Sequence, residues 1–178
     1  TRLLTVTGVQ TCALPIFLYS PPKVAALGAV MREGRDRAGM KSVPADLTGV
    51  RGLYRALQRG EAIGILPDQV PGGGEGEWTE FFGRQAYTMT LAMRMAGARR
   101  APVLIACAER LPRGAGYRIR VEPLPDAAPD ETPERCMNRA LEALIRDCPA
   151  QYLWAYNRYK VPAGVAAPQQ ALAPGEAG

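Results

Sequence analysis

Residues 49–69 read GVRGLYRALQRGEAIGILPDQ, which is a helical pattern followed by a strand pattern. Residues 62–66 are short, mostly apolar and closed by a proline, which predicts a buried strand. Before them, Gly60 is placed to end a helix. The apolar side chains of that helix fall on one face, namely Val50, Leu53, Tyr54 and Leu57.

The same alternation of helix and strand continues on both sides of this segment. Helical patterns cover residues 22–38, 88–98 and 132–148, and the second of these is apolar almost all round, so that it must be buried or face lipid. Strand patterns cover residues 41–44, 102–108 and 117–121, the last with the period of two of a half-exposed strand. Together these patterns predict one α/β domain in which helices cover a mixed sheet.

Composition restricts the function more than the fold. The 178 residues have room for about one domain, and no apolar run reaches the ~18 residues of a membrane-spanning helix. There is no histidine, which excludes histidine as a general base or metal ligand within this chain. The net charge of +5 favours anionic partners, and four cysteines without CxxC spacing indicate reduced thiols in a cytosolic compartment.

Three motifs hold candidate binding residues, each with a plainer alternative. Asp68 and Gln69 follow the buried strand and could bind a polar group or orient a base, although an aspartate after proline also starts turns. The glycine-rich residues 70–76 lack the ending of a phosphate loop and favour a flexible loop. Arg35 and Arg37 could present guanidinium groups to phosphate or carboxylate, or form a solvated helix end.

Four motifs, in this order, resemble those of the lipid A late acyltransferases, the lauroyl and myristoyl transferases. They are GRDR at residues 34–37, GILPDQ at 64–69, EFFGRQAYT at 80–88 and QYLWAYNRYK at 151–160. The resemblance runs from about Phe17 to Lys160. It implies a glycerolipid-acyltransferase-like α/β fold that is incomplete at its N-terminus.

The resemblance also implies an activity and a set of partners. Family members take a fatty acyl chain from acyl carrier protein and esterify a hydroxyl of a lipid A precursor, at the cytoplasmic face of the bacterial inner membrane. The expected partners are therefore acyl carrier protein, a lipid A precursor and the membrane surface, without nucleic acid, and neither a cofactor nor a metal is expected. Two alternatives stay open: an acyltransferase for another lipid acceptor, or a non-catalytic protein that binds lipid or carrier protein.

Site residues follow from the resemblance position by position. Arg35 matches the arginine of the GRxR motif and Asp68 the acid of the PDQ motif, with Arg37 and Gln69 as weaker neighbours. The remaining matches lie in the FFG motif and after it, where packing is an equal alternative to substrate binding: they are Phe82, Gly83 and Thr88. The family's catalytic HxxxxD or HxxxxE motif has no counterpart here, so we expect no catalytic base in this chain.

The first residues suggest why that motif is missing. VTGVQTCALPI, residues 6–16, resembles the translation of a sequencing adapter, whereas the alternative is a short apolar strand. We therefore divide the chain into an adapter-derived segment 1–16, an acyltransferase segment 17–160 and a disordered tail 161–178. Losing the preceding elements should leave parts of the core uncovered, which predicts poor solubility.

Overall fold

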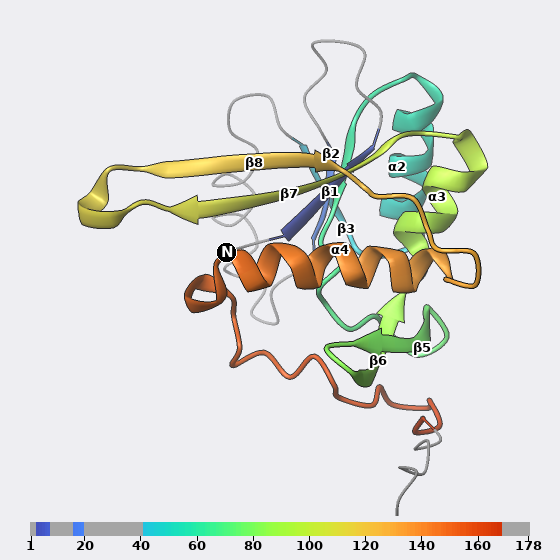
Figure 1. Ribbon diagram of the computed structural model, residues 1–178. Helices are drawn as coiled ribbons and strands as arrows, with labels where there is room; N and C mark the ends of the chain where they lie inside the picture. Colours follow the sequence, from blue (N-terminus) through green and yellow to red (C-terminus); the bar gives the residue numbers. More distant parts are fainter. Residues whose placement is uncertain (1–2, 8–15, 20–40, 169–178) are drawn as a thin grey trace, which may run out of the picture.

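A mixed six-stranded sheet forms the centre of the computed structural model, which describes residues 3–7, 16–19 and 41–168 (Figure 1). The strand order is β3-β2-β4-β1-β7-β8. Strand β2 is parallel to β3 and β4, whereas β1 is antiparallel to β4 and β7, and β8 is antiparallel to β7. The strands are β1 (Leu3–Thr7), β2 (Ile16–Tyr19), β3 (Lys41–Pro44), β4 (Ile63–Ile65), β7 (Val103–Arg110) and β8 (Tyr117–Pro123). The predicted α/β class with a mixed sheet is confirmed.

Helix α2 (Leu47–Gln58) ends where its sequence predicts, and its start is capped by a side chain. The Asp46 carboxylate accepts a hydrogen bond from the Gly49 N–H at 2.9 Å, and Gly60 follows the helix with a φ of 75°. Leu53, Ala56 and Leu57 are buried against β4 and its neighbours. This helix and β4 confirm the pattern predicted for residues 49–69.

Glycine at position 64 is required by the neighbouring strand. Strands β2 and β4 pair in parallel, with Phe17 opposite Gly64. A Cβ at position 64 would collide with the Phe17 ring. The glycine of the GILPDQ motif is thus explained by the packing of an aromatic ring on β4.

A separate hairpin joins β5 (Gly76–Phe81) to β6 (Arg84–Met89), and α3 (Leu91–Arg99) follows directly. The helix predicted over residues 88–98 is therefore wrong at its start, because Thr88 and Met89 pair with Glu77 and Gly76 as the last residues of β6. It is also less enclosed than predicted, since Arg94, Gly97 and Ala98 are exposed.

Helix α4 (Pro133–Asp147) runs along the hairpin and ends beside β8 (Figure 1). The Thr132 hydroxyl accepts a hydrogen bond from the Arg135 N–H and so caps the start of the helix. The buried side of α4 carries not only apolar residues such as Met137 and Leu141 but a polar ridge at four-residue spacing. The ridge consists of Glu134, Asn138 and Glu142.

The remaining predictions about segments have mixed outcomes. The helix predicted over residues 22–38 lies outside the described residues. Leu3–Thr7 forms β1, whereas the adapter origin of residues 1–16 concerns the DNA and stays a prediction. In the predicted tail, residues 161–168 are described, and the Ala166 carbonyl accepts a hydrogen bond from the Trp78 indole at 3.0 Å. None of the helices in the described part of the chain combines the length and apolar character needed to cross a bilayer.

Candidate functional site

The LPDQ segment turns away from the sheet where β4 ends. Ile63, Ile65 and Pro67 are buried, and the following turn leaves Asp68 half-buried and Gln69 exposed. The turn predicted as the alternative role of Asp68 is thus present. It still places a carboxylate at the C-terminal end of a buried strand, where ligands gather in α/β folds.

The C-terminal aromatic run, residues 151–160, lies against this turn. The Tyr156 hydroxyl accepts a hydrogen bond from the Val70 N–H at 2.8 Å, although the two residues are 86 positions apart. A cleft of about 280 Å³ opens here, lined by Phe81 and by residues 152 and 154–159. The Trp154 ring packs against Tyr152, with 4.9 Å between ring centroids, but its side chain is exposed. The cleft therefore has an aromatic wall that is open to solvent.

A buried guanidinium anchors the run to the rest of the molecule. Arg158 is 2% exposed and donates hydrogen bonds to the Tyr87 carbonyl and to the Thr88 hydroxyl, both at 2.8 Å. The Thr88 oxygen also accepts from the Asn138 amide at 3.0 Å. Thr88 is fully buried within this network. Its position supports the packing alternative for this predicted binding residue.

The charges of Arg158, which lines the cleft, and of Asp68, on the adjacent turn, oppose each other. Burial lowers the pKa of Arg158, and the negative charge of Asp68 is among the influences that oppose this shift. Burial, followed by the charge of Asp68, raises the pKa of Tyr152 to about 12. At neutral pH, Tyr152 therefore keeps its proton and can donate a hydrogen bond, but it cannot serve as a base. Tyr152 can bind and orient a polar group in the cleft, whereas abstracting a proton there needs another residue.

The FFG motif forms the tight turn between β5 and β6. Phe82 and Gly83 have φ angles of 49° and 73°, and the flanking Phe81 and Arg84 pair with each other. Two residues with positive φ define the type I′ turn that suits a two-residue hairpin. The Phe82 N–H donates to the Glu142 carboxylate at 2.9 Å. Gly83 thus has a conformational role.

The Phe82 side chain extends the aromatic wall. Its ring lies 6.0 Å from the Trp154 ring, and the Arg146 guanidinium lies 4.9 Å from its centroid. Among the predicted site residues, the structure brings Asp68, Phe82 and Thr88 around the C-terminal run. Gln69 is exposed, and Arg35 and Arg37 lie outside the described residues.

Sequence reasoning overlooked two contributors to this site. Asn138 lies on the polar ridge of α4, whose four-residue spacing on a helix with a strong apolar stripe was a readable signal. The burial of Arg158 had no local signal, because its partners Tyr87 and Thr88 are about 70 positions away.

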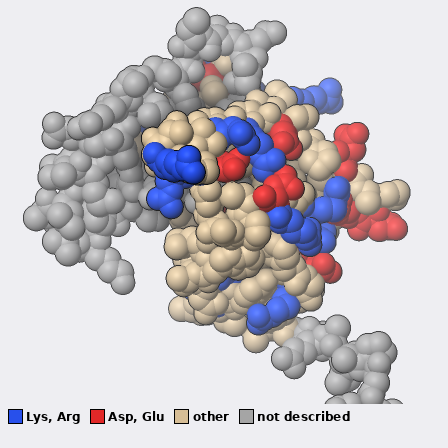
Figure 2. Space-filling view, turned by 60° about the vertical axis from the view of Figure 1, so that its left-hand side comes forward, with Lys and Arg blue, Asp and Glu red and all other residues tan. Residues whose placement is uncertain are grey.

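On the face shown in Figure 2, acidic and basic side chains are interspersed, and the ion pairs of the β7–β8 hairpin include Arg118 with Glu109.

Comparison with known proteins gives a consistent result. The profile of the family described as bacterial lipid A biosynthesis acyltransferase matches residues 9–161. The chain is 30% identical to a lipid A biosynthesis lauroyltransferase of Escherichia coli (strain K12) over 159 residues, 84% of this chain and 50% of that protein. It is 28% identical to a lipid A biosynthesis palmitoleoyltransferase of the same organism over 155 residues, 84% of this chain and 49% of that protein. The chain thus spans about half the length of the curated relatives it matches.

Proposed function

Because this chain belongs to the bacterial lipid A biosynthesis acyltransferase family, we propose that it serves in the transfer of a fatty acyl chain from acyl carrier protein to a hydroxyl of a lipid A precursor. The observation that carries this proposal is the extent of the family match, residues 9–161. The residues that line the cleft, Phe81, Tyr152 and residues 154–159, all lie within it, and so does the LPDQ turn. The names of two relatives, a lauroyltransferase and a palmitoleoyltransferase, support a fatty acyl group as the transferred group.

The proposed reaction divides its tasks between this chain and residues outside it. The acceptor hydroxyl loses its proton to a base as its oxygen attacks the thioester carbonyl, the carbon–sulfur bond breaks, and the carrier leaves as a thiol that has gained a proton. Asp68 and Tyr152 offer hydrogen-bonding groups that orient the polar end of a substrate, and we assign Arg35 and Arg37 to phosphate or to developing oxyanion charge. The chain contains no histidine, so we expect the residues printed here to be inactive by themselves.

Location at the membrane belongs to the same proposal. A lipid A precursor is an amphiphile, and its acyl chains stay in a bilayer while its hydroxyl groups are at the surface. We therefore place the protein at the cytoplasmic face of the bacterial inner membrane, where a soluble carrier protein and a membrane lipid can meet.

The test begins with the parent DNA, sequenced across the codon for Phe17. An HxxxxD or HxxxxE motif shortly upstream would support the proposal, and a genuinely encoded segment 1–16 would favour a binding protein without catalysis. The intact enzyme is then given acyl carrier protein thioester and lipid A precursor, and product is measured by mass spectrometry. Asp68→Asn should lower kcat by about 10- to 100-fold, and the exposed Asp130→Asn is the matched control.

The choice of acceptor distinguishes this proposal from the alternative of an acyltransferase for another lipid acceptor. A panel that contains a lipid A precursor and a lysophospholipid should show transfer to the former. Preference for the lysophospholipid would point to a related acyltransferase for another acceptor. Absence of transfer to any hydroxyl acceptor by the intact protein would refute the proposed function.

A further inference from the structure

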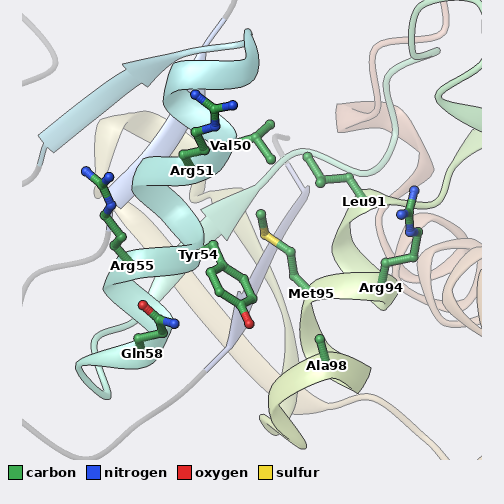
Figure 3. Close-up of a pocket in the computed structure, with 9 residues that line it drawn as sticks. All are labelled: Val50, Arg51, Tyr54, Arg55, Gln58, Leu91, Arg94, Met95 and Ala98. Carbon is green, nitrogen blue, oxygen red and sulfur yellow. The ribbon is translucent and has the colours of Figure 1, made fainter.

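Helices α2 and α3 leave an open groove of about 580 Å³ between them (Figure 3). Its floor consists of apolar groups from both helices. Helix α2 contributes Val50 and Tyr54, four residues apart, and α3 contributes Leu91, Met95 and Ala98 at the i, i+4 and i+7 positions. These spacings align the side chains in two ridges that face each other across the groove.

The rim of the groove is positively charged. Arg51 and Arg55 lie on the α2 side and Arg94 on the α3 side, and all three are exposed. The Arg99 guanidinium lies 5.4 Å from the centroid of the Tyr54 ring on the floor. Neither helix contains an acidic residue. Within the described part of the chain, none of these four arginines forms an ion pair.

From this arrangement we infer that the α2–α3 groove docks an amphipathic helix with acidic flanks from a partner protein. Two turns of helix span the distance between Val50 and Gln58, about 12 Å. A helix laid in such a groove buries its apolar stripe between the ridges, and its flanking carboxylates meet the arginine rim. An acyl chain would leave one side in water, because the groove is open to solvent.

The chemistry of the occupant identifies the partner class. On the proposed function, the acidic protein that must approach this enzyme is the acyl carrier protein, so the inference rests on that proposal and deepens it. Charge complementarity of this kind mainly speeds encounter and selects the partner, and it weakens at high salt.

Binding of a fluorescently labelled bacterial acyl carrier protein to the 178-residue chain tests the inference. Anisotropy titrations at about 50 mM and about 300 mM salt should show weaker binding at the higher salt. Arg55→Glu combined with Arg94→Glu should weaken binding by about 10-fold or more. Arg110→Glu with Arg113→Glu changes the net charge equally at exposed positions outside the groove, and it should change binding by less than about 2-fold.

A second pair of variants keeps the arginines and changes the floor. Ala98 is exposed, so both Ala98→Glu and Ala98→Lys should fold, which a circular dichroism melt checks. The glutamate should weaken carrier binding because it faces acidic flanks, whereas the lysine should preserve it. The inference would be overturned if Ala98→Glu and Ala98→Lys changed carrier binding equally. It would also be overturned if the double variant at Arg55 and Arg94 changed carrier binding no more than the double variant at Arg110 and Arg113.

Other occupants are separate outcomes of the same set of experiments. If the chain sediments with phosphatidylglycerol vesicles in a way that depends on Arg55 and Arg94, and does not bind the carrier protein, the inference is overturned in favour of a membrane surface. A dimer in light scattering that Ala98→Glu dissociates, again without carrier binding, would overturn it in favour of a second copy. If the intact enzyme transfers acyl chains equally well with and without Arg55 and Arg94, docking in the groove is refuted but the proposed function is not. If carrier binding depends on the groove but no acyl transfer occurs, the proposed function is refuted but docking is not.

Discussion

Thr88 shows why a motif residue can be indispensable without touching a substrate. Its hydroxyl accepts hydrogen bonds from Arg158 and Asn138 and donates to the Ala86 carbonyl at 3.1 Å. A buried guanidinium needs such partners, because a charge without them pays the full cost of leaving water. The threonine of EFFGRQAYT thus fixes the C-terminal run to β6.

Replacing this hydroxyl should be costly. We predict that Thr88→Val lowers the free energy of unfolding by about 2 to 4 kcal/mol, because a hydrogen bond to a buried charged group is lost at nearly constant volume. Urea denaturation followed by circular dichroism measures the loss. Thr48→Val, at an exposed position of α2, is the matched control. A Thr88→Val protein as stable as the control would contradict the assigned role.

Glu134 provides a test by pH. Burial, and next the charge and hydrogen bond of Glu77, raises the pKa of Glu134 from 4.5 to about 7. Between these values the folded state holds a proton that the unfolded state has lost, so this contribution to stability is full below about pH 4.5 and declines as the pH rises through 7.

Glu134→Gln removes the ionisable group, so it should remove the loss of stability that occurs as the pH rises through 7. The variant should gain stability relative to the parent as the pH rises, by about 1 to 3 kcal/mol at about pH 8, and little at about pH 5. Melting temperatures across this range give the difference, with the exposed Glu122→Gln as control. If Glu134→Gln and Glu122→Gln show the same pH profile, burial does not raise the pKa of Glu134, which would contradict the structure.

At the scale of elements, α4 holds the β5–β6 hairpin along its whole length. Each residue of its polar ridge meets a different part: Glu134 meets Glu77, Asn138 donates to the Glu80 carbonyl at 2.9 Å, and Glu142 accepts from the Phe82 N–H. These polar contacts fix the hairpin together with its buried apolar side chains, which include Phe81 and Ala86. This arrangement explains why its tight turn must keep one geometry.

The turn itself makes a prediction with an internal control. Gly83→Ala should destabilise the protein by about 1 kcal/mol, because φ is 73° and an L-residue with a Cβ is strained there. Gly97→Ala should instead be neutral or stabilising by up to about 1 kcal/mol, since Gly97 lies in α3 and a Cβ there would meet nothing within 4 Å. Thermal melts of both variants decide the point, and a shift of the same sign in both would refute it.

These elements also show how far the sequence alone could lead. Helices α2 and α4 and strands β4 and β7 were predictable because their periodicity and caps are local signals. The boundary between β6 and α3 was not, because Thr88 and Met89 owe their conformation to pairing with Glu77 and Gly76. The cleft was only partly predictable: Asp68 stood out, but its meeting with Tyr152 and Arg158 depends on contacts over more than 80 positions.

On the scale of the whole molecule, the edge strand β8 is exposed at all but one of its positions. On its charged side, Arg120 is half-buried and forms an ion pair with Asp147 at the end of α4, at 2.8 Å, whereas Arg118 and Glu122 are exposed. Its apolar side is exposed: Tyr117 is 67%, Ile119 62% and Val121 54% accessible. The period of two in residues 117–121 predicted the strand correctly, but a period does not say which face meets water.

An exposed apolar stripe on an edge strand favours self-association, so removing it should improve solubility. Ile119→Thr combined with Val121→Thr keeps β-branched side chains suited to a strand, and it should increase the monomer fraction in size-exclusion chromatography and reduce binding of a hydrophobic dye. Its melting temperature should stay within a few degrees of the parent, because little buried area is lost.

Ile105→Thr is the contrasting variant, since Ile105 lies on the neighbouring β7 and is 2% exposed. That substitution should lower the free energy of unfolding by about 1 to 3 kcal/mol, because it places a hydroxyl in the core. If Ile119→Thr with Val121→Thr melts as early as Ile105→Thr, the stripe belongs to the core and the orientation of β8 is wrong. If it melts like the parent and stays monomeric, the stripe is a free surface whose removal leaves the fold unchanged.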